Sequence, residues 1–143
     1  GSYARDIVVN IFDGKMHPVD SNELAFKLAG RNAFRQAFKK ANPKILEPIY
    51  EVEIFVPSEN MGAVMTDLAG RRGMPLGSES DGEYQTIRAR VPLAEMNKYS
   101  TTLSSISSGR ASYEMHFAEY QAVPADVQAA VIKKYEEENK EEE

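Results

Sequence analysis

The 143-residue chain contains no cysteine and no tryptophan, and its only histidines are His17 and His116. The absence of thiols excludes a disulfide framework and a thiol nucleophile, and two separated histidines offer little to a zinc ion. No hydrophobic run approaches the roughly 20 residues that a membrane-spanning helix needs, and the first residues show no secretory signal. We therefore expect a cytoplasmic protein with no membrane partner and no bound metal.

The sequence also lacks the short motifs of the common enzyme classes, such as the phosphate-binding loop, the zinc-protease helix and the serine-hydrolase turn. Three carboxylates, Asp67, Glu95 and Glu119, are scattered through amphipathic segments. Surface positions are far more common for such residues than a catalytic pair. We therefore predict that this chain holds no catalytic residue and no cofactor.

Charge is unevenly distributed along the chain, which carries a formal net charge of −5. Residues 136–143, EEENKEEE, contain six glutamates and one lysine. They account for the whole net charge, so the rest of the chain is neutral. We interpret the acidic run as a solvated, frayed end in preference to a regulatory tail.

Residues Arg5–Phe12, RDIVVNIF, alternate apolar side chains on both faces and predict a strand that stops at Asp13-Gly14. A strand of this kind needs neighbouring strands, and residues 1–47 supply no others. We therefore expect the chain to be part of a longer protein. In this chain alone, we expect the segment to be frayed, docked out of place or paired with another molecule.

A helix is predicted from about residue 21 to 41, because apolar residues recur on one face and Asn42-Pro43 marks an end. Asp20, with Glu23 three residues later, is the predicted N-cap. Four cations follow every four residues along one side: Lys27, Arg31, Arg35 and Lys39. Such a stripe is more often a solvated face than a phosphate-binding one, and both interpretations stay open.

From Pro48 onward the sequence predicts two strand–helix–strand halves joined by a hairpin. The expected elements are strand 49–57, helix 58–73, strands 74–80 and 84–92, helix 93–107, strand 110–120 and helix 124–138. Ser58 is the expected N-cap of the first helix, Gly73 its expected stop, and Asp81-Gly82 the hairpin turn. The βαββαβ order is typical of a ferredoxin-like sandwich, in which both helices cover one face of a four-stranded antiparallel sheet.

The predicted fold class is therefore α+β, with three parts. Residues 1–47 are an incomplete strand-plus-helix piece of an α/β domain. Residues 48–122 form the ferredoxin-like sandwich, and residues 123–143 form a C-terminal helix with the acidic tail.

Three loops combine glycine with cations: DGKMHP at residues 13–18, GRRG at 70–73 and SSGRASY at 107–113. Arginine beside glycine can give bidentate hydrogen bonds to a phosphate at close range. Arginine near the C-terminal end of a helix is also favourable without any ligand, so each loop alone indicates nucleic-acid binding only weakly. His17, a lone loop histidine, is not predicted to be a general base.

Several segments, in order, resemble the C-terminal part of translation elongation factor G. They are DGKMHPVDSNELAF, MGAVMTDLAGRRG, IRARVPLAEMNKYSTTLSS and GRASYEMHFAEYQAVP. The resemblance covers nearly the whole chain and implies that residues 1–47 are the end of domain IV and residues 48–122 are domain V. It also implies that the intact protein is a GTPase that uses GTP and Mg, with its nucleotide-binding domain outside this chain.

In that family, domain IV enters the decoding region of the small ribosomal subunit, and domain V lies near the sarcin–ricin loop and the stalk base of the large subunit. The resemblance therefore implies the ribosome-binding part of a translocase that promotes tRNA–mRNA movement from the A to the P site. It assigns contacts with tRNA, mRNA and the decoding region to Gly14, Lys15, Met16, His17 and Pro18, with His17 at the leading end. It assigns contacts with rRNA in domain V to Arg71, Arg72, Ser108 and Arg110.

Three residues depart from the usual family pattern: Met16, Pro18 and Ala63. They leave open whether the protein is the housekeeping factor or a diverged paralogue, for example one that serves ribosome recycling. A ribosome protection protein with the same domain plan is another alternative. A ferredoxin-like protein-interaction module with no RNA role is an alternative of a different class.

Overall fold

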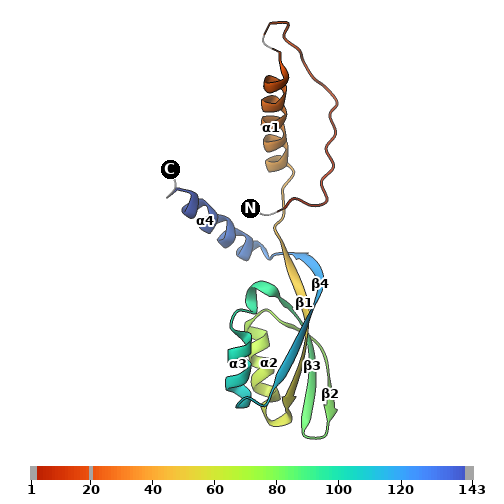
Figure 1. The fold of residues 1–143 in the computed structure, drawn as a ribbon, viewed down its shortest axis with the longest axis vertical. Coiled ribbons are helices and arrows are strands. Elements are labelled where there is room, and N and C mark those ends of the chain that lie inside the picture. The colour runs from red at the N-terminus through yellow and green to blue at the C-terminus, as the bar shows by residue number, and fades with distance from the viewer. Residues whose placement is uncertain (1–2, 20, 141–143) are drawn as a thin grey trace. The chain divides into compact units, whose positions relative to one another are not determined.

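A computed structural model describes residues 3–19 and 21–140 of the chain (Figure 1). The chain forms two compact units, Gly1–Pro43 and Lys44–Glu143, which we call the N-terminal unit and the C-terminal unit and describe separately. Asn42, just before the division, has a φ of 56°, a left-handed conformation that asparagine tolerates, and Pro43 follows it. This pair ends the helix of the N-terminal unit.

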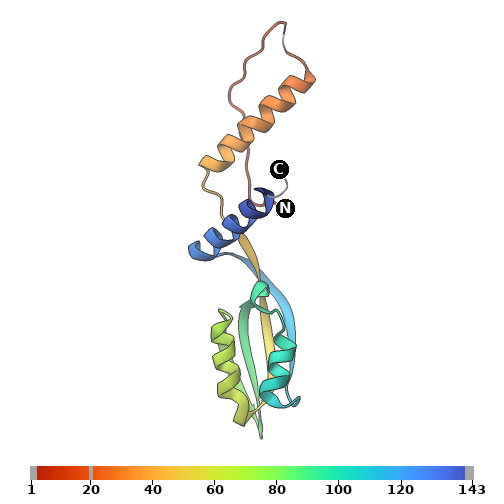
Figure 2. The same cartoon turned by 90° about the vertical axis from the view of Figure 1, so that its left-hand side faces the viewer.

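The C-terminal unit contains an antiparallel sheet of four strands in the order β2-β3-β1-β4. The strands are β1 Leu46–Pro57, β2 Met74–Asp81, β3 Tyr84–Pro92 and β4 Ser112–Ala122. Two helices, α2 Met61–Gly70 and α3 Tyr99–Ser107, cover one face of this sheet, as Figures 1 and 2 show. The predicted α+β fold with a ferredoxin-like βαββαβ sandwich is confirmed.

The hydrophobic core of this unit lies between the sheet and the two helices. Its side chains alternate along β1 and β3 and recur every four residues on α2 and α3, the periods of a strand and a helix that each pack on one side. The core residues are Val52, Ile54, Val56, Ile87, Ala89 and Val91 from the strands, and Val64, Leu68, Tyr99 and Leu103 from the helices.

Strand β1 is paired over different lengths on its two sides. It pairs with β4 from Leu46 onward, whereas its pairing with β3 begins only at Ile49, opposite Pro92. β3 ends at that proline, and the chain turns into the short 3-10 helix η2, Leu93–Glu95. The first residues of β1, 46–48, therefore have a strand neighbour on one side only.

Both predicted helices of the sandwich are interrupted. The first divides into the 3-10 turn η1, Ser58–Asn60, and α2. The predicted N-cap role of Ser58 is wrong, because Ser58 lies inside η1 and Asn60 occupies the N-cap position of α2. The second divides into η2 and α3, because Lys98 adopts a left-handed φ of 57° that no helix can contain.

Helix α4, Ala125–Lys140, follows β4 and includes the start of the acidic run. Residues 136–140 of the acidic run thus continue this helix, and residues 141–143 lie outside the described residues. Among the helices that the structure describes, none combines the length and the apolarity needed to cross a bilayer.

Helix α1, Glu23–Lys40, confirms the predicted helix of the N-terminal unit. Its N-cap is Asn22, whose Oδ1 accepts a hydrogen bond from the Ala25 backbone N–H at 2.8 Å. Asn22 thus takes the capping role predicted for Asp20, which itself lies outside the described residues. No side chain of α1 is buried in the described structure.

The predicted strand Arg5–Phe12 does not form. Residues 3–17 make no strand pairing with any other described part of the chain. Ile11 and Phe12 are 90% and 95% exposed. The physical reason is that a strand needs a hydrogen-bonding neighbour, and the described part of this unit offers only a turn and one helix.

Candidate functional site

The loop of residues 14–18 is exposed and is held through its backbone. The Gly14 N–H donates to Asp13 Oδ1 at 2.8 Å, at the start of the loop. The His17 N–H donates to Ser21 Oγ at 2.7 Å, and the His17 carbonyl accepts from the Ser21 N–H at 3.1 Å. Because Ser21 and the cap residue Asn22 directly precede α1, the helix fixes the backbone of His17.

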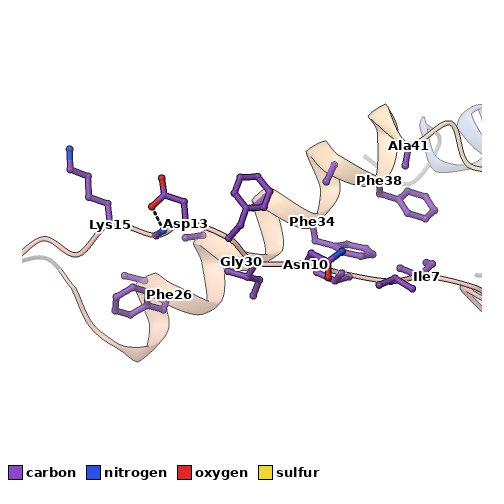
Figure 3. A pocket seen from close by; sticks show the side chains of 18 of the residues that line it. Ile7, Asn10, Asp13, Lys15, Phe26, Gly30, Phe34, Phe38 and Ala41 are labelled. Atoms are coloured by element: carbon purple, nitrogen blue, oxygen red, sulfur yellow. Dashed lines mark hydrogen bonds between the residues drawn. The ribbon is translucent and has the colours of Figure 1, made fainter.

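The extended segment before this loop runs along the apolar side of α1. The groove between them is lined by Ile7 and Asn10 of the segment and by Phe26, Phe34 and Phe38 of the helix, among others (Figure 3). The rings of Phe34 and Phe38 stack with their centroids 5.7 Å apart. All three phenylalanines nevertheless remain exposed. The loop is therefore supported by an open layer of apolar side chains and not by a closed core.

The cations that line α1 also lie on exposed surface. Lys27 pairs with Glu23 at 2.9 Å, an exposed contact of the kind that contributes little to stability. The stripe therefore offers positive charge to solvent or to a partner. Both interpretations of it, a solvated face and a phosphate-binding face, stay open.

Arg71 follows α2 directly, and its guanidinium is surrounded by acceptors of the fold. Nε donates to Asp67 Oδ2 at 2.9 Å. The terminal nitrogens donate to the carbonyl oxygens of Glu95 and Asn97 at 2.6 and 3.0 Å and to Thr102 Oγ1 at 3.2 Å. The guanidinium also lies over the Tyr99 ring, 5.1 Å from its centroid. Arg71 thus joins the end of α2 to η2 and α3.

Arg72 occupies the left-handed position of the turn that ends α2, with a φ of 57°. The turn is a Schellman motif, closed by hydrogen bonds from the Arg72 N–H to the Ala69 carbonyl at 3.3 Å and from the Gly73 N–H to the Leu68 carbonyl at 2.8 Å. Glycine is the usual residue at the left-handed position, because that conformation costs other residues about 1–2 kcal/mol. At Gly73, a Cβ would stand 2.7 Å from the Leu68 carbonyl oxygen, so this close approach requires glycine.

The side chain of Arg72 binds two carboxylates. Its terminal nitrogens donate to both oxygens of Glu47 at 2.8 and 3.0 Å, and Nε donates to Glu95 Oε1 at 3.1 Å. The Glu47 side chain is only 10% exposed and that of Arg72 is 28% exposed. The hydrogen bonds that Arg72 donates to Glu47 raise the pKa of Arg72 further above its ordinary value, against the opposing effect of burial. Arg72 is therefore a permanently charged and mostly enclosed cation.

Ser108 and Arg110 belong to the turn after α3. Ser108 and Gly109 are both left-handed, with φ of 53° and 78°. The Arg110 guanidinium pairs with Glu59, and its Nε donates to the Ser107 carbonyl at 3.2 Å. The side chains of Arg110 and Glu59 are 49% and 65% exposed. The hydrogen bond to Glu59 raises the pKa of Arg110. This cation is therefore half exposed, beside a carboxylate that is more exposed.

The two arginine-bearing turns lie at opposite ends of the helical layer. Asn60 Nδ2, at the start of α2, donates to the Ile106 carbonyl near the end of α3 at 3.0 Å, so the two helices run antiparallel. The structure therefore brings Arg71 and Arg72 together at one end and Ser108 and Arg110 together at the other. The four residues do not form one site.

The sequence patterns do not reveal the carboxylates that hold these arginines. They indicate a surface position for Glu95 and do not single out Glu47 or Glu59. Glu47 lies 25 positions from Arg72, and Glu59 lies 51 positions from Arg110, so no local spacing indicates either pair. Only the Asp67–Arg71 pair, one helical turn apart, has a spacing that could have shown it.

Comparison with known proteins divides the chain at the same place as the structure. The sequence pattern described as "Elongation factor G C-terminus" matches residues 44–131, and that described as "Elongation factor G, domain IV" matches residues 1–42. The chain belongs to the elongation factor G family. The resemblance in the sequence is therefore confirmed.

Two relatives from this comparison match nearly the whole chain or most of it, but the chain covers only a small part of each relative. An elongation factor G-like protein from Thermotoga maritima is 46% identical over 139 residues, which are 96% of this chain and 20% of the relative. A crystal structure of a protein from Thermus thermophilus matches with a TM-score of 0.69 and 37% identity, over 85% of this chain and 18% of that chain. The chain thus spans about a fifth of the length of these relatives.

Proposed function

We propose that this chain is the ribosome-binding part of an elongation factor G-like translocase that promotes tRNA–mRNA movement from the A to the P site. The observation that carries the proposal is the exposed loop 14–18, in which the backbone of His17 is bound to Ser21 at the start of α1. A loop held in this way can contact a nucleic-acid backbone at a fixed position. Backbone contacts do not read sequence, which suits a factor that acts on every codon.

In the same proposal, the turn after α3 contacts rRNA near the sarcin–ricin loop and the stalk base. Arg110 supports this role because its guanidinium is half exposed and its one carboxylate partner is exposed too. Arg71 and Arg72 are bound to acceptors within the fold, which favours a structural role for both. Family membership makes the ribosome the expected partner of both regions.

We further propose that the full-length protein is a cytoplasmic GTPase that uses GTP and Mg. Residues 1–143 would contribute no nucleotide contact to it, since they match domain IV and the C-terminus of the family. The upstream sequence, read for a phosphate-binding loop, tests this part of the proposal.

The central test replaces His17 by alanine in the full-length factor that carries this sequence. If His17 contacts the tRNA–mRNA complex during movement, translocation should slow by about tenfold, equivalent to a barrier higher by about 1.4 kcal/mol. Ribosome-stimulated GTP hydrolysis should stay within about twofold of the original, because this residue does not belong to the nucleotide site. Rapid kinetics with a fluorescent mRNA and phosphate release measure the two rates on the same preparation.

His116→Ala is the matched control, since His116 is the other histidine of the chain and lies on β4. It should leave both rates unchanged. Equal loss of translocation and GTP hydrolysis in His17→Ala would contradict the proposed role of the loop.

Normal translocation with slowed subunit splitting would favour a recycling paralogue, and release of tetracycline from ribosomes would favour a protection protein. An intact protein that does not sediment with ribosomes at moderate salt would favour the protein-interaction module.

A further inference from the structure

Glu47 is a nearly buried carboxylate at the point where the C-terminal unit begins. It is the second residue of β1, and its side chain is 10% exposed. Both of its oxygens accept hydrogen bonds from Arg72, at 2.8 and 3.0 Å. Removal of the arginine would leave an enclosed negative charge without its cation, which proteins tolerate poorly. The pair therefore holds the start of β1 firmly.

The Glu47–Arg72 pair lies where β1 lacks a second neighbouring strand. Residues 46–48 pair with β4, but on their other side β3 has already ended at Pro92. On that side the chain continues as η2, and its Glu95 accepts a hydrogen bond from Arg72 Nε at 3.1 Å. Arg72 thus links Glu47 to Glu95 across the place where the strand ladder is missing.

The residue before β1 is secured by the C-terminal helix. The Ile45 N–H donates to Gln128 Oε1 of α4 at 3.0 Å, and the Ile45 carbonyl accepts from the Val123 N–H at 2.9 Å. Ile45 is therefore tied to the segment that follows β4, whereas Glu47 is tied to the turn after α2. Together these contacts hold the first residues of the unit along both edges of the strand.

The backbone of Arg72 agrees with an anchoring role. A non-glycine residue with a φ of 57° is strained, and such strain persists where the surrounding structure over-determines it. Glycine in this turn would remove the strain but could not bind Glu47 or Glu95. Arginine at position 72 therefore binds Glu47 and Glu95 in spite of its strained, left-handed backbone.

We propose that Arg72 is a positioning residue that anchors the base of β1 and does not contact rRNA. The inference rests on the proposed translocase function: the residues just before β1 join the two units, so a displacement passed along the chain from the C-terminal unit toward loop 14–18 goes through them. If the start of β1 frayed, it would absorb part of that displacement. The contacts of Arg72 with Glu47 and Glu95 prevent this fraying.

The first experiment measures amide hydrogen exchange in this chain and compares Arg72→Gln and Glu47→Gln with the original. Exchange at residues 45–47 should accelerate by about tenfold in both variants, whereas exchange at residues 52–56 should not change, because opening is local. Arg88→Gln is the control, since Arg88 forms an exposed pair with Glu79 at 3.0 Å elsewhere on the sheet. It should leave both regions unchanged. Equal acceleration at residues 52–56 would mean a general loss of stability and would overturn the proposal.

The second experiment places the same substitutions in the full-length factor. Translocation should slow by about tenfold in Arg72→Gln and in Glu47→Gln, while the affinity for ribosomes stays unchanged. Arg72→Lys should recover little, because lysine keeps the charge but cannot bind a carboxylate through two parallel hydrogen bonds.

Weaker ribosome binding by Arg72→Gln, with normal binding by Glu47→Gln and by Arg72→Lys, would identify a phosphate contact and overturn the proposal. If the unmodified factor does not move tRNA at all, the proposed function fails, and the exchange data still decide whether the anchor exists.

Discussion

Two arginine-bearing turns close the opposite ends of the α2–α3 layer, and they hold their arginines differently. After α2, Arg71 and Arg72 donate to carboxylates, carbonyls and a hydroxyl of the fold. After α3, Arg110 lies half exposed beside the more exposed Glu59. An enclosed cation is costly to move to a new partner, whereas an exposed ion pair exchanges at little cost. The comparison therefore separates two cations that support the fold from one that can bind an external phosphate.

The first prediction concerns stability, where the difference between the turns should be largest. Arg71→Ala removes the cation from Asp67 and from the carbonyls of Glu95 and Asn97, so it should lower the free energy of unfolding by about 2–4 kcal/mol. Arg110→Ala should lower it much less, because its ion pair with Glu59 is largely exposed and its other hydrogen bond is to the Ser107 carbonyl. Urea unfolding followed by circular dichroism measures both. Similar losses in the two variants would remove the distinction between the turns.

A smaller effect is expected at Gly73, which closes the turn of Arg72. A Cβ at Gly73 would stand 2.7 Å from the Leu68 carbonyl oxygen, so Gly73→Ala should destabilise the unit by about 1–3 kcal/mol. Gly62→Ala, within α2 itself, is the matched control, because a Cβ there meets nothing within 4 Å. It should be neutral or stabilise by about 0.5–1 kcal/mol. The melting temperatures of both variants check the prediction, and equal melting temperatures would contradict the crowded turn.

The smallest effect concerns Tyr99, the ring beneath Arg71. Burial raises the pKa of Tyr99 above its ordinary value, and among the described residues its hydroxyl has no hydrogen-bond partner. Tyr99→Phe should therefore be neutral or stabilise by up to about 1 kcal/mol at pH 8.

The pH dependence of the same variant follows from the direction of the pKa shift. The unfolded chain loses the tyrosine proton near about pH 10, before the folded chain does, so stability falls as the pH rises above that value. Tyr99→Phe should reduce this alkaline loss, and Tyr3→Phe, at an exposed tyrosine, should not. Urea midpoints at pH 8 and above pH 10 measure it. Parallel curves for Tyr99→Phe and the original would show that folding does not change the ionisation of Tyr99, and they would contradict the raised pKa.

Much of the C-terminal unit could be predicted, because its strand and helix patterns find partners within the same unit. β1 alternates Val52, Ile54 and Val56, and all three are buried between strands and helices. Arg5–Phe12 alternates just as regularly, yet it forms no strand, since the described chain gives it no neighbour. A hydrophobic pattern thus predicts which residues can be buried, and the rest of the chain decides whether they are.

The candidate site was predictable in part for the same reason. The exposure of loop 14–18 follows from its glycine, proline and polar residues. The arginines at positions 71, 72 and 110 could not be distinguished, because each follows a helix beside glycine and their partners are far away in sequence. The left-handed backbone of Arg72 could not be predicted either, since the sequence indicated the next residue, Gly73, as the end of the helix.

The most direct measurement is the affinity of the full-length factor for ribosomes across a range of KCl concentrations. Each phosphate contact that is lost should lower the slope of log affinity against log salt by about one. The account predicts this decrease for Arg110→Gln and an unchanged slope for Arg72→Gln. A decrease for Arg72→Gln together with an unchanged slope for Arg110→Gln would contradict it.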